Sequence, residues 1–83
     1  MKVFQAITPY GAGLLFTSAE KAYKAVKKTI ENDITDYNIY GATDKVRSLE
    51  KDLETFNERY KDYLDGDGAF GTGGYWVNEL KVY

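Results

Sequence analysis

Four carboxylate side chains recur at every fourth position of one stretch of the chain: Glu50, Glu54, Glu58 and Asp62. Residues four apart in an α-helix lie on one face, about 6 Å apart along the axis, so these four form a slowly turning acidic ridge. Neighbouring like charges destabilise a helix slightly, which favours a contact surface for a basic partner. The alternative is a solvated face, because four bases lie three residues from members of the ridge: Arg47, Lys51, Arg59 and Lys61.

A group of lysines is the second candidate site. The outer side of an expected helix carries Lys21, Lys24, Lys27 and Lys28. A basic face of this kind attracts the phosphates of a nucleic acid or of a nucleotide-like molecule. Binding to nucleic acid usually also needs arginines or an aromatic platform, and the sequence contains no recognisable nucleic-acid-binding motif. The lysine face is therefore the alternative to the acidic ridge.

Residues 65–74 are rich in glycine and match two ligand-binding patterns only in part. Gly66 to Gly71 spells G-x-G-x-x-G, but the expected helix precedes this motif and the expected strand follows it, the reverse of a dinucleotide site. Asp65 and Asp67 have the spacing that begins a calcium loop, yet Trp76 stands where such a loop needs its glutamate. The segment therefore predicts a mobile structural connector, with no cofactor and no metal.

Aromatic side chains make up 16% of the chain, and eight of them are tyrosines. Several are expected in loops or at a strand end, where aromatic residues often form recognition surfaces: Tyr10, Tyr37, Tyr40, Phe70 and Tyr75. Of these, Tyr37 and Tyr40 are the aromatic residues that we predict to contact a partner.

The composition argues against catalysis. The chain has no cysteine and no histidine, so it lacks thiolate chemistry and the commonest general base and metal ligand. Ser18 and Ser48 have no evident base to activate them. The net charge is only −2, and no apolar run reaches the length of a membrane span. These features indicate one cytoplasmic domain over residues 1–83 that is no enzyme.

Two amphipathic helices must position these side chains. Residues 43–64 carry an apolar seam with steps of three and four residues: Val46, Leu49, Leu53, Phe56, Tyr60 and Tyr63. A shorter helix over residues 18–32 follows Thr17, which with Glu20 matches a capping box. The spacing predicts that the two helices pack as an antiparallel pair.

Three strands complete the expected fold. Residues 2–8 and 13–16 form a hairpin whose five-residue turn, residues 9–13, shares Gly13 with the second strand, and residues 75–83 form the last strand. The sequence therefore predicts an α+β fold of order β-β-α-α-β, a small three-stranded sheet with one face covered by the helix pair and the first strand in the middle. The expected core contains Val26, Ile30, Leu49, Leu53, Phe56 and Trp76.

Four segments carry a family resemblance: the opening K-V-F-Q-A-I-T, the turn Y-G-A-G, the helix start F-T-S-A-E-K-A and the closing Y-W-V-N-E-L-K-V-Y. In this order they resemble small accessory proteins of tailed bacteriophages. The resemblance implies a protein that binds and inhibits or redirects a host protein, including defence complexes, and it implies no site residue. We therefore predict a non-enzymatic binding protein, monomeric or homodimeric, whose acidic ridge and tyrosines meet a basic surface of a host protein.

Overall fold

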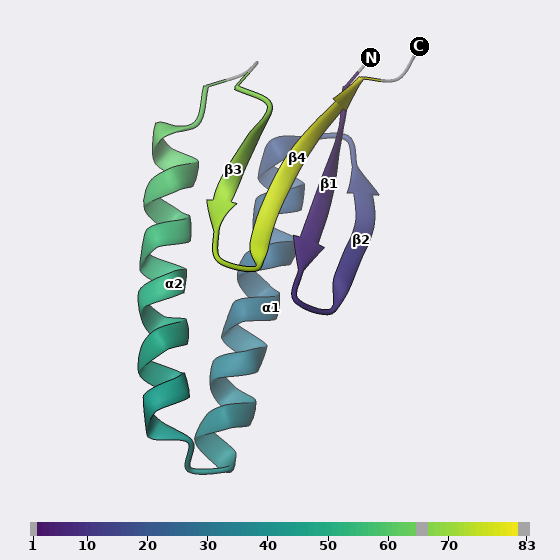
Figure 1. The fold of residues 1–83 in the computed structure, drawn as a ribbon. Coiled ribbons are helices and arrows are strands. Elements are labelled where there is room, and N and C mark those ends of the chain that lie inside the picture. Colours follow the sequence, from purple (N-terminus) through teal and green to yellow (C-terminus); the bar gives the residue numbers. More distant parts are fainter. Residues whose placement is uncertain (1, 65–66, 82–83) are drawn as a thin grey trace.

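The computed structural model describes residues 2–64 and 67–81 of the chain. The elements in chain order are β1 (Lys2–Thr8), β2 (Gly11–Phe16), α1 (Ala19–Ile39), α2 (Thr43–Asp62), β3 (Ala69–Thr72) and β4 (Tyr75–Lys81) (Figure 1). The α+β class is confirmed, whereas the prediction of three strands is wrong. The glycine-rich segment contributes a fourth strand, β3, so the order is β-β-α-α-β-β.

The four strands form one antiparallel sheet in the order β2-β1-β4-β3. β1 lies inside the sheet, as expected, and pairs along its length with β4, from Lys2 opposite Lys81 to Ile7 opposite Trp76. The turn between β1 and β2 contains only Pro9 and Tyr10, so β2 begins two residues earlier than the sequence indicated.

Glycine permits the unexpected strand β3. A Cβ atom at Gly71 would lie 2.3 Å from the carbonyl oxygen of Tyr75 and 2.7 Å from the Cα of Trp76. The backbones of β3 and β4 approach so closely there that no larger residue fits. The description of this segment as a connector is therefore wrong for Ala69–Thr72, where the glycine belongs to a sheet edge. Gly66, the first residue of the G-x-G-x-x-G motif, lies outside the described residues.

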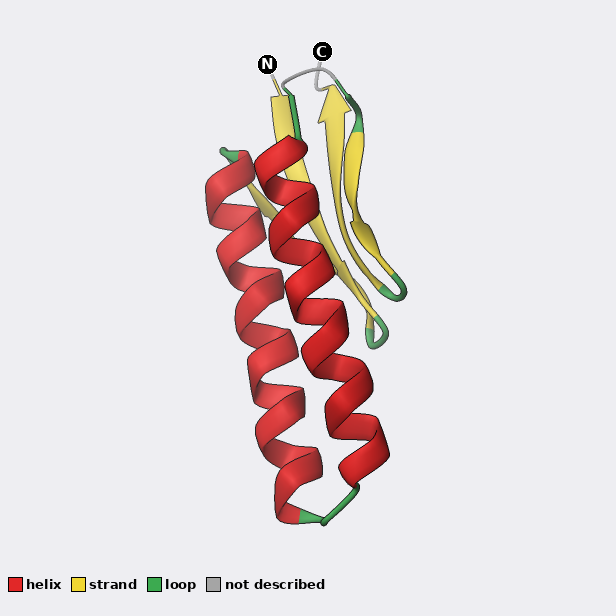
Figure 2. Ribbon diagram, turned by 90° about the vertical axis from the view of Figure 1, so that its left-hand side faces the viewer, coloured by secondary structure: helices red, strands yellow, loops and turns green. Residues whose placement is uncertain are grey.

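The helices form a second layer on one face of the sheet (Figure 2). α1 ends at Ile39 rather than near residue 32, because Ile34 and Tyr37 continue the face that packs against the core. Its N-cap is Ser18, whose hydroxyl accepts a hydrogen bond from the amide of Lys21, and not the predicted Thr17. The antiparallel pair extends beyond the strands, and Figure 1 shows the turn between α1 and α2 well clear of the sheet.

The core lies between the two layers. Its largest fully buried side chains are Phe56, Ile30, Val26 and Val77. Phe56 and Phe70 form part of an aromatic cluster in which the rings of Tyr23 and Tyr60 stack 3.9 Å apart. Four of the six predicted core residues, Val26, Ile30, Leu49 and Phe56, are buried, and Leu53 packs against them partly buried.

The prediction that Trp76 is a core residue is wrong. In the register of the sheet, Ala6 lies opposite Val77, and both are buried beneath the helices. Successive side chains of a strand point to opposite faces, so Trp76 lies on the other side of the sheet. Neither described helix is long and apolar enough to cross a membrane.

Candidate functional site

The sheet has one face that no described helix covers. Phe4 and Ala6 of β1 are buried beneath the helices, so the alternate side chains of β1 and of the residues paired with them point outward. These outward residues are Val3, Gln5 and Ile7 of β1, Ala12 and Leu15 of β2, Ala69 and Gly71 of β3, and Trp76, Asn78 and Leu80 of β4. We call this set the outer face.

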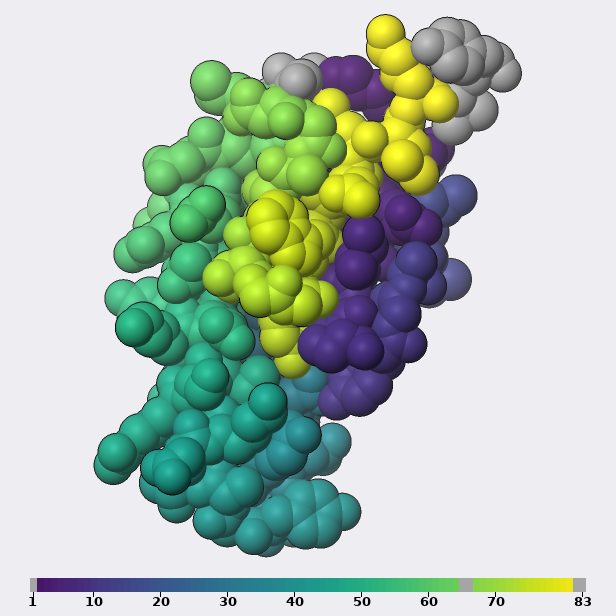
Figure 3. All heavy atoms as spheres, in the orientation of Figure 1, coloured from purple at the N-terminus to yellow at the C-terminus, as the bar shows by residue number. Residues whose placement is uncertain are grey.

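None of the outer-face residues is charged, although charged residues make up 29% of the chain. The exposed fractions of its large apolar side chains are 58% for Leu15, 37% for Trp76 and 38% for Leu80. Figure 3 shows this side of the molecule, with the yellow atoms of β4 and the purple atoms of β1 at the surface. An antiparallel sheet that faces water normally carries polar residues there, so this composition is typical of a face that another surface covers.

The outer face continues to an open sheet edge at β2, whose one neighbour among the described strands is β1. Proteins usually protect an exposed edge with a charged residue or a proline. Residues 11–16, G-A-G-L-L-F, contain neither. The opposite edge, β3, is shorter, with four residues. β2 is therefore the longer, uncharged edge, and its register with β1 shifts by one residue between Gln5 and Ile7.

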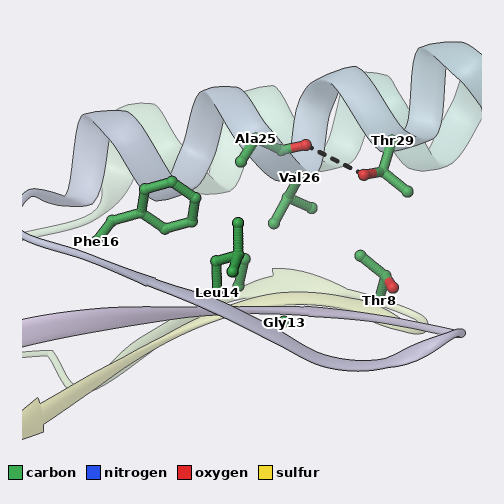
Figure 4. A pocket seen from close by; sticks show the side chains of 8 residues that line it. Thr8, Gly13, Leu14, Phe16, Ala25, Val26 and Thr29 are labelled. Carbon is green, nitrogen blue, oxygen red and sulfur yellow. Dashed lines mark hydrogen bonds between the residues drawn. The ribbon is translucent and has the colours of Figure 1, made fainter.

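An open pocket of about 230 Å³ lies between β2 and α1 (Figure 4). Leu14 points from the strand toward Val26 of the helix, and 75% of its surface is nevertheless exposed. The lining is mostly apolar: Ala6, Thr8, Gly13, Leu14, Phe16, Ala25, Val26 and Thr29. The Thr29 hydroxyl already donates to the carbonyl oxygen of Ala25, 3.2 Å away. The pocket can therefore hold a small apolar side chain beside an unpaired strand.

The four lysines of α1 have different surroundings. Lys24 forms an ion pair with Glu20 at 3.0 Å, and the ammonium of Lys27 lies 6.0 Å from the centre of the Tyr23 ring. In the described parts of the chain, no carboxylate lies within ion-pair distance of Lys21 or Lys28. These two exposed lysines lie four residues before and three residues after Ala25, so they share one side of α1 with this lining residue.

The carboxylates of the acidic ridge, Glu50, Glu54, Glu58 and Asp62, are all exposed on α2. Among the described residues no base pairs with them, so the expected neutralisation by neighbouring lysines and arginines is not seen at ion-pair distance. The ridge lies on the helix layer and is separate from the outer face of the sheet.

Of the two predicted partner-binding tyrosines, Tyr40 lies in the turn between α1 and α2, as expected, and Tyr37 does not lie in a loop. Tyr37 lies within α1, half-buried, with the Lys45 ammonium 5.7 Å from the centre of its ring. Tyr40 is the C-cap of α1 and is 83% exposed at the end of the helix pair. Asp62 ends α2 some 20 residues after this turn, about 30 Å away along the helix. Phe70, expected in a loop, is a buried residue of β3, and Tyr75 begins β4, at the strand end where it was expected, and is buried.

One buried carboxylate, Asp33, was not identified from the sequence. Asp33 accepts hydrogen bonds from the hydroxyls of Tyr10 at 2.8 Å and Tyr75 at 2.7 Å, and so joins the first turn, α1 and β4. The hydrogen bond to Asp33 raises the pKa of Tyr10, and burial followed by the bond to Asp33 raises the pKa of Tyr75. Asp33 follows the buried Val26 by seven residues, so an acid on the apolar face was the missed signal.

This carboxylate has a structural role. Each carboxylate oxygen of Asp33 accepts a hydrogen bond from a tyrosine hydroxyl that is neutral at physiological pH. The described residues contain no group of three acidic, cysteine or histidine side chains that could hold a metal ion. In the glycine-rich segment, Asp67 accepts a hydrogen bond from the amide of Leu64, while Asp65 lies outside the described residues.

Comparisons with models of known families, with curated proteins and with solved structures found no match to this chain. The candidate surfaces therefore rest on geometry and composition.

Proposed function

We propose that this protein is a non-enzymatic binding protein that contacts another protein through the outer face of its sheet and the adjoining β2 edge. The observation that carries the proposal is the absence of charged residues from the outer face. Leu15, Trp76 and Leu80 expose apolar area there that a neighbouring surface removes from water, at a gain of roughly 25 cal/mol per Å².

The free β2 edge makes an extended strand of the partner the expected occupant. A strand that pairs with β2 satisfies the outward amide and carbonyl groups of the edge and widens the sheet. Its outward side chains then extend the outer face, so that one partner covers both features. From the resemblance to phage accessory proteins we propose further that the partner is a bacterial host protein that is inhibited or redirected.

The acidic ridge remains a second proposed contact surface. It is favoured by the exposure of all four carboxylates and by the lack of ion pairs to them within the described chain. A basic protein surface is the partner that this ridge would attract, and the attraction would weaken as salt rises.

Capture from a bacterial lysate, followed by reconstitution with the purified partner, separates these surfaces. The Leu15→Lys, Leu80→Lys protein places charge on the outer face and should lose the partner that the unmodified protein retains. The Glu54→Lys, Glu58→Lys protein tests the ridge. Trp76 is the only tryptophan of the chain, so its fluorescence should change when the purified partner covers the outer face.

A matched control introduces two lysines at exposed apolar positions away from the sheet, Ile39→Lys and Leu64→Lys. This control should retain the partner, and all variants should show the circular dichroism of the unmodified protein. Retention of the partner by the Leu15→Lys, Leu80→Lys protein contradicts the proposal. Loss of the partner only in the ridge variant moves the contact to α2.

A further inference from the structure

β2 and α1 together form a groove with three parts that suit one extended segment. The strand offers an unpaired edge, the pocket offers apolar depth, and Lys21 and Lys28 provide charge beside it. Figure 2 shows that α1 runs alongside the strands, so a strand added to β2 would also run beside this helix. The alternate side chains of that added strand would point toward α1.

The spacing of the two lysines determines which positions of the added strand can pair with them. Lys21 and Lys28 are seven residues apart, which is about 10 Å along the helix, with Ala25 between them. In an added strand, two side chains separated by three residues on the same face lie about 14 Å apart, with one side chain between them. Long flexible side chains absorb the difference of about 4 Å between these spans.

Charge distinguishes the classes of occupant. A second copy of this chain paired antiparallel through β2 would bring its own Lys21 and Lys28 toward the first pair, and like charges oppose association. An acidic segment instead gives each lysine a counter-ion. The mostly apolar lining of the pocket next to Val26 calls for an apolar residue between the two acids.

We infer that the groove between β2 and α1 binds an extended protein segment of the pattern acidic-x-apolar-x-acidic by strand addition. The central apolar side chain enters the pocket beside Leu14 and Ala25, and the flanking carboxylates pair with Lys21 and Lys28. This inference rests on the proposed function as a protein-binding domain and adds the chemistry of the segment that is recognised.

The probe is a capped nine-residue peptide of threonine and valine that carries glutamate, leucine and glutamate at alternate central positions. It is titrated into the full-length, ¹⁵N-labelled protein and followed by amide chemical shifts. Saturable shifts are expected at β2 and around Ala25 and Thr29. Peptides with asparagine in place of leucine, or lysine in place of both glutamates, should bind about tenfold more weakly.

A charge swap provides the decisive comparison. Lys21→Glu with Lys28→Glu should weaken the glutamate peptide about tenfold and should bind the lysine peptide more tightly than the glutamate peptide. The matched control, Lys51→Glu with Lys61→Glu on α2, makes the same change in net charge and should leave the affinity within about twofold. Rescue by the swapped peptide also shows that the variant is folded.

Three results overturn the inference: no saturable shift up to about 2 mM peptide, which detects dissociation constants near 1 mM; shifts confined to regions other than β2 and α1; or equal weakening by both lysine pairs. If these occur while the outer-face variant still loses its protein partner, the proposed function stands and the inference fails. If the peptide binds as expected but no protein partner depends on the outer face or β2, the proposed function fails.

Discussion

The two faces of the sheet are built from the same four strands and have opposite surroundings. On the inner face, Phe4, Ala6 and Val77 are buried, and the one buried carboxylate has two hydrogen-bond donors. On the outer face, Leu15 and Trp76 remain exposed with no charged side chain among their strand neighbours. Both faces therefore carry apolar side chains, and they differ because the helices cover only the inner face. The side chains of β1 are therefore suited to burial on both of its sides.

Truncation of a side chain in the core between the helices and the inner face should have the largest effect. Phe56 is fully buried and contacts the aromatic cluster, so Phe56→Ala removes a ring and leaves a cavity. We expect the free energy of unfolding to fall by about 3–5 kcal/mol, measured by urea denaturation. A loss below about 1 kcal/mol is typical of an exposed position and would contradict the assignment of the core to this side.

Loss of the buried carboxylate should rank second. Asp33→Ala leaves the hydroxyl of Tyr75 buried without its acceptor, and we expect a destabilisation of about 2–4 kcal/mol. Tyr10→Phe removes a single bond from a side chain that is largely exposed and should cost about 1 kcal/mol or less. The double variant measures the coupling between the two residues, and simple additivity would show that Asp33 and Tyr10 do not interact.

High pH should weaken the inner face through the same network. The raised pKa of Tyr75 keeps its hydroxyl protonated in the folded protein while unfolded tyrosines begin to ionise near pH 10. The unfolded state then binds fewer protons, so stability is full below about pH 10 and falls as pH rises above it. Urea titrations across this range should show a shallower fall for Tyr75→Phe; an identical fall would contradict the protonated state of Tyr75.

Substitution on the outer face should have the smallest effect on folding. Leu15 is mostly exposed, and threonine keeps a side chain that suits a strand, so Leu15→Thr should change the free energy of unfolding by about 0.5 kcal/mol or less. Thermal or urea unfolding of the purified protein is the measurement. A loss comparable with that of Phe56→Ala would show that the outer face is already packed in the isolated chain.

Periodicity was enough to predict the helix pair and the central position of β1. The three-and-four spacing from Val46 to Phe56 depends only on helix geometry, and α2 matches its predicted start at residue 43. The end of α1 was missed because Asp33 breaks the apolar pattern, although its charge is satisfied by two hydroxyls that come from distant parts of the chain. A tertiary hydrogen bond leaves no periodic signal.

The faces of the last strand and the existence of β3 depend on register, which local sequence does not specify. Trp76 alternates with Tyr75 and Val77, and either set is apolar enough to be buried. The one glycine of β3, Gly71, has low strand propensity, and its position is explained only by its close approach to Tyr75. The acidic ridge was predicted as an exposed face and is one; its role as a contact surface stays a prediction.

The pairing of β1 with β4 has a consequence for the order of events during synthesis. The two strands at the centre of the sheet are separated by nearly the whole length of the chain, from Lys2 opposite Lys81 to Ile7 opposite Trp76. The helix pair and the β1–β2 hairpin use contacts close in sequence, so they can form before β1 pairs with β4. β1 must wait for residues 75–81 to emerge, and until then its free edge is available to chaperones and to other nascent chains. Before β4 is added, the β1–β2 hairpin therefore has an open edge at each strand. In the finished sheet β4 pairs with β1, so of these two edges only that of β2 stays open.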